Sequence, residues 1–277
     1  MVPPAHGDGF VNAPQPSIRG VSIDVRGVTK RYKSARGEPI QALELVDLDI
    51  APGEFISIVG PSGCGKSTLM MLVSGLIPVS SGEIRVDGKP IFGAVKQAGI
   101  VFQRDVLLDW RSVLDNVMLP VEIKKLDPKT HLVKARQLLA SVGLAGFEDK
   151  YPGELSGGMR QRASICRALV QNPGLLLMDE PFGALDALTR EQMNVDLQRI
   201  WMQERNTVVF ITHSIEEAVL LADRVVVMSA RPGRIADVLE IDMPRPRGSH
   251  SRSDPAFLHH VEKIRRHFMA LGILSEA

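Results

Sequence analysis

The chain has 277 residues, 44% hydrophobic and 23% charged, which suits one large or two small globular domains. Its net charge of +1 predicts no nucleic-acid surface, and two distant cysteines make no disulfide framework, so a reducing compartment fits. Because the sequence has no apolar run of about 18 residues, we do not expect it to span a membrane. Because its N-terminus lacks a basic region followed by an apolar core, we do not expect secretion.

The first part of the chain divides at about residue 20. Met1–Gly20 carries prolines and glycines with little apolar periodicity, so residues 1–20 are predicted to form a disordered or loosely attached arm. From Val21 to Ile50, apolar and polar residues alternate as in short strands. Tyr32 follows two cations there, a set suited to a base and its phosphates, although it could equally be an ordinary tyrosine at a strand end.

A phosphate-binding pattern, G-x-x-x-x-G-K-[ST], follows. Its residues, with the threonine after them, are Gly60, Pro61, Ser62, Gly63, Cys64, Gly65, Lys66, Ser67 and Thr68. The run Glu54–Val59 before it reads as a buried strand, and a helical apolar face follows, which is the context that the pattern requires. Backbone N–H groups and the helix N-terminus would face phosphate, Lys66 would reach the β- and γ-phosphates, and Ser67 would ligate Mg²⁺.

The segment from Gln103 to about Ala163 is mostly helical in pattern. Breaks are expected at Pro120, Asp127-Pro128 and Tyr151-Pro152. Near its start an apolar cluster stands among charges: Val106, Leu107, Leu108 and Trp110. This cluster could pack inside the helical part, or it could form a groove for a partner.

A second glycine-rich motif ends this segment. It consists of Leu155, Ser156, Gly157, Gly158 and Met159, and a helix is predicted to begin there. Serine and glycines at a helix N-terminus make an anion site, but this one has no lysine of its own. We infer that it closes over phosphate held by Lys66 of a second copy, with the two chains packed head to tail.

Polar residues end two later strands. The apolar run Gly174–Met178 leads into Asp179 and Glu180, at the edge where parallel sheets bind ligands. Asp179 is placed to hold Mg²⁺ and Glu180 to polarise an attacking water, although two acids could simply open a surface loop. His213 ends another buried strand; such a histidine is often only a polar cap, but its position after the two acids favours catalysis.

In this order, the motifs resemble those of the ATP-binding cassette (ABC) ATPases from about Val21 to Arg234. The resemblance implies an α/β P-loop NTPase fold: a core with a mixed sheet, an antiparallel β subdomain and a helical subdomain at about 104–163. The ATPase domain would span residues 21–243. Residues 244–277 would form a linker and an amphipathic C-terminal helix that docks on its own domain or, less favoured, meets a membrane surface.

The resemblance also implies residue roles. Tyr32 would stack on adenine, and Gln103 would touch both Mg²⁺ and a transmembrane partner. Glu180 would be the catalytic base, His213 would sense the γ-phosphate, and Asp186 would link the two sites of a dimer. The implied metal ligands are Ser67, Gln103 and Asp179.

Two positions depart from the family pattern. Met159 replaces the usual glutamine and Gly183 the usual serine. Because Ser156 and the glycine amides remain, we expect activity to survive both departures.

These features predict the ATPase subunit of an ABC importer on the cytoplasmic face of the inner membrane. It would bind ATP and Mg²⁺, form a homodimer, and work with a separate permease and an extracytoplasmic solute-binding protein. The loop after Gln103 resembles importers for nitrate, sulfonates or taurine. A soluble non-transport ABC ATPase and an exporter subunit are the alternatives. Repair ATPases of this family carry a long coiled coil, for which residues 68–155 leave no room, and translation ATPases carry two cassettes, whereas this chain has one. Exporter cassettes are often fused to their membrane spans, and this cassette is free.

Overall fold

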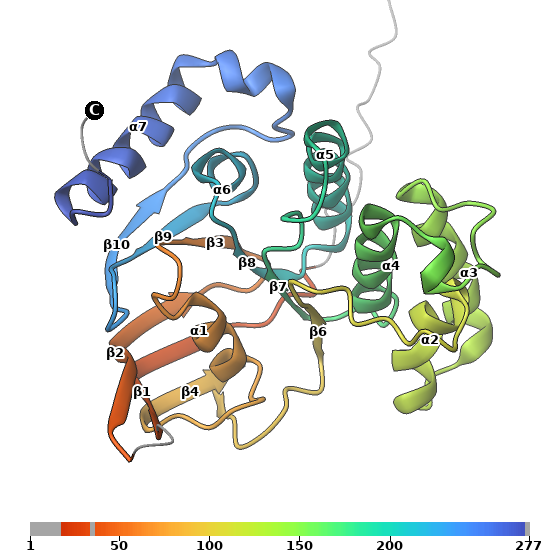
Figure 1. Ribbon diagram of the computed structural model, residues 1–277, viewed down its shortest axis with the longest axis horizontal. Coiled ribbons are helices and arrows are strands. Elements are labelled where there is room, and N and C mark those ends of the chain that lie inside the picture. The colour runs from red at the N-terminus through yellow and green to blue at the C-terminus, as the bar shows by residue number, and fades with distance from the viewer. Residues whose placement is uncertain (1–17, 34–36, 275–277) are drawn as a thin grey trace, which may run out of the picture.

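The computed structural model describes residues 18–33 and 37–274, so most of the predicted N-terminal arm lies outside the described residues. A six-stranded mixed sheet forms the centre, in the order β10-β9-β3-β8-β7-β6 (Figure 1). All neighbouring strands run parallel except the antiparallel pair β9–β10. The strands are β3 (Phe55–Val59), β6 (Ala98–Val101), β7 (Leu175–Asp179), β8 (Thr207–Ile211), β9 (Arg224–Met228) and β10 (Ile235–Glu240).

A second, antiparallel sheet has the order β2-β1-β4-β5. Its strands are β1 (Ile23–Lys33), β2 (Pro39–Ile50), β4 (Ser81–Val86) and β5 (Lys89–Pro90). Helix α1 (Lys66–Val73) lies between the two sheets (Figure 1), and one apolar core joins side chains of all three, among them Val25, Ile58 and Leu69. The predicted combination of a mixed and an antiparallel sheet is therefore confirmed.

The other helices cover the second face of the central sheet and extend beyond its β6 edge (Figure 1). They are α2 (Val113–Ile123), α3 (Pro128–Ser141), α4 (Gly157–Leu169), α5 (Ala187–Glu204), α6 (Ile215–Leu221) and α7 (Pro255–Ala270), with short 3₁₀ turns at Pro152–Glu154 and Ser249–Ser253. Within the described ranges, no helix is both long and apolar enough to span a bilayer.

One predicted helix break is wrong. Pro120 lies inside α2 rather than at its end. Proline removes one helical hydrogen bond, but the buried stripe of Val113, Val117 and Val121 holds the helix against the core on both sides of it. At the next predicted break, Asp127 caps α3 and Pro128 opens it, as expected.

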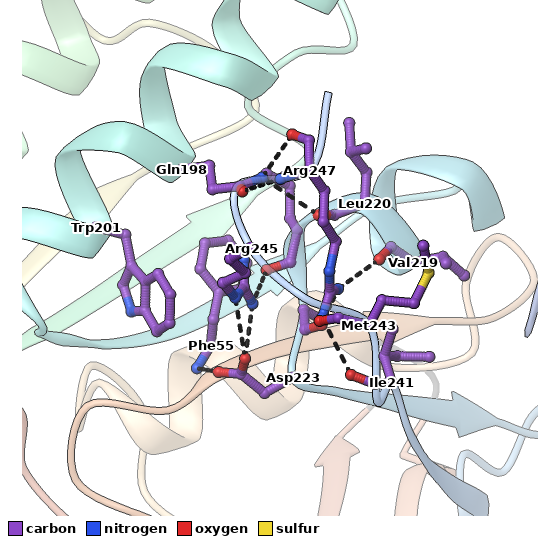
Figure 2. Close-up of polar contacts among 12 residues, drawn as sticks. Phe55, Gln198, Trp201, Val219, Leu220, Asp223, Ile241, Met243, Arg245 and Arg247 are labelled. Atoms are coloured by element: carbon purple, nitrogen blue, oxygen red, sulfur yellow. Dashed lines mark hydrogen bonds and ion pairs between the residues drawn. The ribbon is translucent and has the colours of Figure 1, made fainter. Parts of the chain in front are cut away.

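The segment predicted as a linker is folded onto the body. Arg247 is 3% exposed, and its guanidinium donates to the carbonyls of Val219, Ala222, Ile241 and Met243 at 2.7–3.1 Å (Figure 2). Burial lowers the pKa of Arg247 to about 10. These four carbonyls take the place of water around the two Nη atoms, which explains how an arginine can be buried here.

Arg245 fixes the same segment in a different way. It pairs with Asp223 at 2.7 Å, and its guanidinium lies 4.3 Å from the centre of the buried Trp201 ring (Figure 2). Asp223 in turn accepts from the backbone N–H of Phe55 at 2.9 Å. The C-terminal segment is thereby tied to β3 and α5, and α7 buries Phe257, Val261, Ile264 and Phe268 as its spacing predicts.

Candidate active site

The phosphate-binding loop connects β3 to α1, where the sequence predicts it. Gly63 and Gly65 have φ angles of 74° and 109°, which side chains rarely adopt. A Cβ on Gly65 would also approach Leu43 Cδ2 to 2.6 Å, so glycine is needed there for space as well. Strand β2 therefore packs directly on the loop and helps to fix its shape.

Lys66 begins α1 and bends back over the loop. Its Nζ donates to the carbonyls of Gly60 and Pro61 at 2.9 and 3.0 Å, and lies 3.9 Å from Cys64 Sγ. Cys64 is buried, and burial raises the pKa of its thiol. The ammonium group is thus held at the mouth of a loop of backbone amides, the arrangement that binds phosphates.

Asp179 ends β7 beside Ser67. Burial raises the pKa of Asp179, a hydrogen bond with Ser67 opposes this, and the neighbouring Glu180 raises the pKa further. A hydroxyl and a partly buried carboxylate are hard oxygen donors, and Mg²⁺ needs only one or two such groups besides phosphate and water. The pair fits the predicted metal site.

Glu180, Gln103 and His213 converge from three strands. Gln103 Nε2 donates to Glu180 Oε2 at 3.0 Å, and His213 Nδ1 lies 3.6 Å from the same oxygen. Glu180 has a φ of 46°, a conformation that costs of the order of 1–3 kcal/mol in a residue with a side chain. Its N–H bonds to Ile211 O at 2.9 Å, which holds the strained residue between β7 and β8.

Tyr32 lies near the end of β1, in the antiparallel sheet. Its side chain is partly exposed, and Lys30 Nζ is 5.2 Å from the ring centre. The paired strand β2 contacts the phosphate loop through Leu43, so this sheet borders the predicted nucleotide site. Contact with adenine stays a prediction.

The second glycine-rich motif begins α4, as predicted. Ser156 is the N-cap, and its Oγ accepts from the N–H of Met159 at 3.2 Å. The amides of Gly157 and Gly158 lie in the first helical turn, where N–H groups have no intrahelical acceptor. Figure 1 shows α4 beyond the β6 edge of the central sheet, whereas α1 lies between the two sheets.

Asp186 has a local partner. It caps α5 by accepting from the N–H of Thr189 at 3.0 Å, and the hydrogen bonds from Thr189 lower its pKa. Its predicted role between two sites is not tested by these contacts. The preceding Leu185 is buried and approaches Gly158: a Cβ on Gly158 would lie 3.1 Å from Leu185 Cδ2.

Arg231 is a site neighbour that the sequence analysis missed. Its Nε donates to the carbonyl of Gly63 at 3.0 Å, which brings a further cation to the phosphate loop. Gly233 follows and packs so closely on Cys64 that a Cβ would lie 1.9 Å from the Cys64 carbonyl oxygen. The Arg-Pro-Gly turn was visible in the sequence, but nothing local showed which loop it would meet.

A groove of about 350 Å³ follows the strand that leads to Gln103. Its lining includes Phe102, Val106, Leu119, Ile123 and Arg167. Of the predicted apolar cluster, Leu107 is buried in the core and Val106 is exposed in the groove, whereas Trp110 is 74% exposed and does not line it. Leu107 thus packs inside the protein, as one interpretation expects, while a partner for the groove at Val106 stays a prediction.

The groove wall is held by an arginine of α4. Val106 has a φ of 48°, which is unusual for a β-branched residue. Arg167 donates to the carbonyls of Val106 and Asp105 at 2.7 and 2.8 Å, and burial lowers the pKa of Arg167. These bonds link the loop after Gln103 to the helix that carries Ser156 at its start.

Comparison with known proteins identifies this assembly of motifs. Residues 43–183 match the sequence profile of the family described as ABC transporter. The chain belongs to this family. It is an ABC ATPase, which binds ATP and hydrolyses it to ADP and phosphate.

Relatives match most of the chain. An uncharacterized ABC transporter ATP-binding protein of Methanocaldococcus jannaschii is 44% identical over 88% of this chain and 90% of its own. The aliphatic sulfonates import ATP-binding protein SsuB of Bacillus cereus is 40% identical over 92% of this chain and 98% of its own. The taurine import ATP-binding protein TauB of Rhizobium johnstonii is 48% identical over 77% and 82%.

A solved structure supports the fold. It is a dimeric ATP-binding cassette in a post-hydrolysis state with ADP and phosphate, 32% identical to this chain. The match has a TM-score of 0.71 and covers 80% of this chain and all of the other. The predicted P-loop ATPase core of the ABC type is therefore confirmed, and the roles of single residues stay predictions.

Proposed function

We propose that this ABC ATPase drives the import of a small organic sulfonate, with taurine and aliphatic sulfonates as the leading candidates. The observation that carries the proposal is the similarity, over 77–92% of this chain, to import proteins for these two solutes. A cassette that serves a permease contacts the solute only indirectly. The solute itself would be selected by the permease and by an extracytoplasmic solute-binding protein.

Two copies of the chain would form the working unit on the cytoplasmic face of the membrane. The dimeric cassette among the structural relatives supports this arrangement. In it, Ser156, Gly157 and Gly158 of one copy would complete the phosphate site of Lys66 in the other. The position of α4 beyond the β6 edge, with α1 between the two sheets, favours closure between copies over closure within one (Figure 1).

Within each site, the residues divide into binding and catalytic groups. Ser67 and Asp179, with Gln103, would hold Mg²⁺, which when bound neutralises charge on the phosphates. Glu180 would accept the proton of the attacking water, and its contacts with Gln103 and His213 orient the carboxylate. Lys66 would bind phosphate directly, with the loop amides around it.

The groove beside Phe102 would receive the permease. Phe102, Val106 and Ile123 present apolar side chains there, and Lys124 and Arg167 add positive charge. An amphipathic helix with an acidic edge would fit such a surface. Because Arg167 ties the groove wall to α4, movement of α4 on ATP binding would reach the permease through this contact.

The test is purification of the tagged chain from its native membranes in mild detergent. We expect a multispanning permease, and a solute-binding protein, to be recovered with it. Ile123→Glu, which places a charge in the groove, should lose the permease and keep ATP binding, whereas Phe92→Glu, at an exposed side chain outside the groove, should keep both. Recovery of soluble partners only would contradict transport and favour a non-transport ABC ATPase.

The solute is tested with the recovered complex in liposomes. Taurine or an alkanesulfonate, with the binding protein, should stimulate ATP hydrolysis, and nitrate should not. Stimulation by nitrate alone would contradict the sulfonate proposal while leaving import intact. Export from the liposomes instead of uptake would contradict import.

A further inference from the structure

Glu217 is a buried carboxylate that the proposed mechanism does not use. It lies in the first turn of α6 and is 6% exposed. Its Oε2 accepts from Thr212 Oγ1 at 2.5 Å, and its Oε1 lies 3.7 Å from Arg190 Nε. A buried carboxylate is stable only when its partners satisfy it, so these contacts define its place.

These contacts involve the residues just before and just after His213 in the sequence. Thr212 Oγ1 also accepts from the N–H of Ser214 at 3.0 Å, and Ser214 Oγ accepts from the N–H of Glu217 at 3.2 Å. In an ordinary capping box the glutamate would bond the N-cap N–H itself. Here Thr212 takes that N–H and Glu217 bonds Thr212, so the residues before and after His213 are fixed by one carboxylate.

Arg190, which faces Glu217, also contacts the loop that follows Glu180. Its Nε and Nη2 donate to the carbonyls of Phe182 and Leu185 at 3.2 and 3.0 Å. Both carbonyls belong to the loop that connects Glu180 to α5. A single guanidinium thus joins this loop to the carboxylate that holds the residues around His213.

We propose that Arg190, Glu217 and Thr212 form a bracket that sets the distance between His213 and Glu180. The three are positioning residues, since they reach the reaction only through these two groups. His213 Nδ1 lies 3.6 Å from Glu180 Oε2, and the His213 side chain is 60% exposed. This inference rests on the proposed catalytic roles of Glu180 and His213.

The bracket also continues toward the second glycine-rich motif. Leu185, whose carbonyl Arg190 holds, packs on Gly158 at the start of α4. Gly158 would face the other copy's phosphate in the proposed dimer. A displacement there would therefore be transmitted through Leu185 and Arg190 to His213 of the same chain.

The experiment measures ATP hydrolysis and ATP affinity in the purified full-length protein. Thr212→Val removes the hydroxyl at nearly constant volume, and Glu217→Gln removes the charge that faces Arg190. We expect each to lower kcat about tenfold, with the KM for ATP changed less than about twofold, because phosphate binding lies elsewhere. Thr212→Ser, which keeps the hydroxyl, should restore most of kcat.

The double variant Thr212→Val/Glu217→Gln separates positioning from simple damage. If both act through one contact, it should lose about tenfold in kcat, not the roughly hundredfold expected for independent sites. Glu262→Gln, in an exposed ion pair on α7, is the control and should leave kcat unchanged.

The possible outcomes distinguish the two proposals. If Glu180→Gln abolishes hydrolysis but Thr212→Val and Glu217→Gln keep wild-type kcat, only the bracket is refuted. A change confined to KM, or an independent hundredfold loss in the double variant, would also refute it. If Glu180→Gln itself hydrolyses ATP normally, the catalytic assignment is wrong and the bracket is refuted with it.

Discussion

Gln103 donates its side-chain amide to the carboxylate of Glu180 at 3.0 Å. Gln103 follows β6, which pairs with β7, and β7 leads directly into Glu180. The loop that starts at Gln103 also forms a wall of the proposed permease groove through Val106. One hydrogen bond therefore connects the candidate base to the surface where a partner would bind.

The first prediction concerns Glu180→Gln. Glutamine keeps an oxygen that can accept from Gln103 but cannot take a proton from water. We expect phosphate release to fall at least about a hundredfold, with ATP binding retained. Phosphate release and equilibrium ATP binding on the same preparation would measure both.

The same variant should accumulate as a dimer, because ATP would bind and not be cleaved. Gel filtration with ATP and Mg²⁺ reports this directly, and the Lys66→Ala variant, which should bind ATP poorly, provides the monomer reference. A Glu180→Gln protein that elutes only as a monomer with saturating ATP would argue strongly against head-to-tail closure.

Local features of the site could be predicted from the sequence because they depend on neighbours in the chain. The loop glycines, the start of α1 at Lys66 and the cap at Ser156 follow from backbone geometry over a few residues. The order of the motifs then determined the family. In these parts of the site, residues that are close in the sequence are also close in space.

Contacts between distant segments could not be predicted in this way. Arg245 and Arg247 stand among prolines and serines, a composition typical of a linker, and several of their acceptors, such as Asp223 and Val219, are more than twenty residues away. The contact of Arg231 with Gly63 likewise joins segments that are far apart in the sequence. In each case the arginine is explained only by carbonyls or carboxylates that the fold brings to it.

The second prediction tests completion of each site by the other copy. Lys66→Ala and Ser156→Arg should each be inactive alone. Mixed and reassembled, half of the dimers would carry both defects in one site and none in the other, so about a quarter of wild-type activity should return if the two sites act independently. ATPase assays across mixing ratios measure this. A mixture with no recovered activity would contradict independent sites completed in trans.

The third prediction concerns the buried arginine of the C-terminal segment. Arg247→Met removes the donors of four carbonyls and leaves them without partners in an apolar region. We expect the free energy of unfolding to fall by about 3 kcal/mol or more. Urea unfolding followed by tryptophan fluorescence measures it, since the buried Trp201 stacks on Arg245 and should change its emission when this segment unfolds.

The control for Arg247 is an arginine on the surface of α7. The Arg266 side chain is 73% exposed and pairs with Glu262 at 3.3 Å. Arg266→Met should change the free energy of unfolding by less than about 0.5 kcal/mol. If Arg247→Met lowers the free energy of unfolding as little as Arg266→Met does, water replaces the guanidinium at position 247 and the segment contributes little to stability.

The last prediction concerns pH and Asp179. Burial raises the pKa of this carboxyl above the ordinary value of 3.8. In the free protein, its contribution to stability is therefore fully present below pH 3.8 and is lost as the pH rises through the raised pKa. Binding of Mg²⁺ with ATP needs the ionised carboxylate, so the affinity should rise with pH, whereas this contribution to stability falls.

We therefore expect Mg²⁺-dependent ATP affinity to weaken as the pH falls toward the raised pKa of Asp179, earlier than an ordinary aspartate would allow. Asp179→Asn should bind weakly at every pH and lose this dependence. Asp186→Asn should keep it, because hydrogen bonds from Thr189 lower the pKa of Asp186 and hold that group ionised throughout. Titration calorimetry from pH 8 to pH 5 measures all three, and the same pH dependence in Asp179→Asn would show that another group controls metal binding.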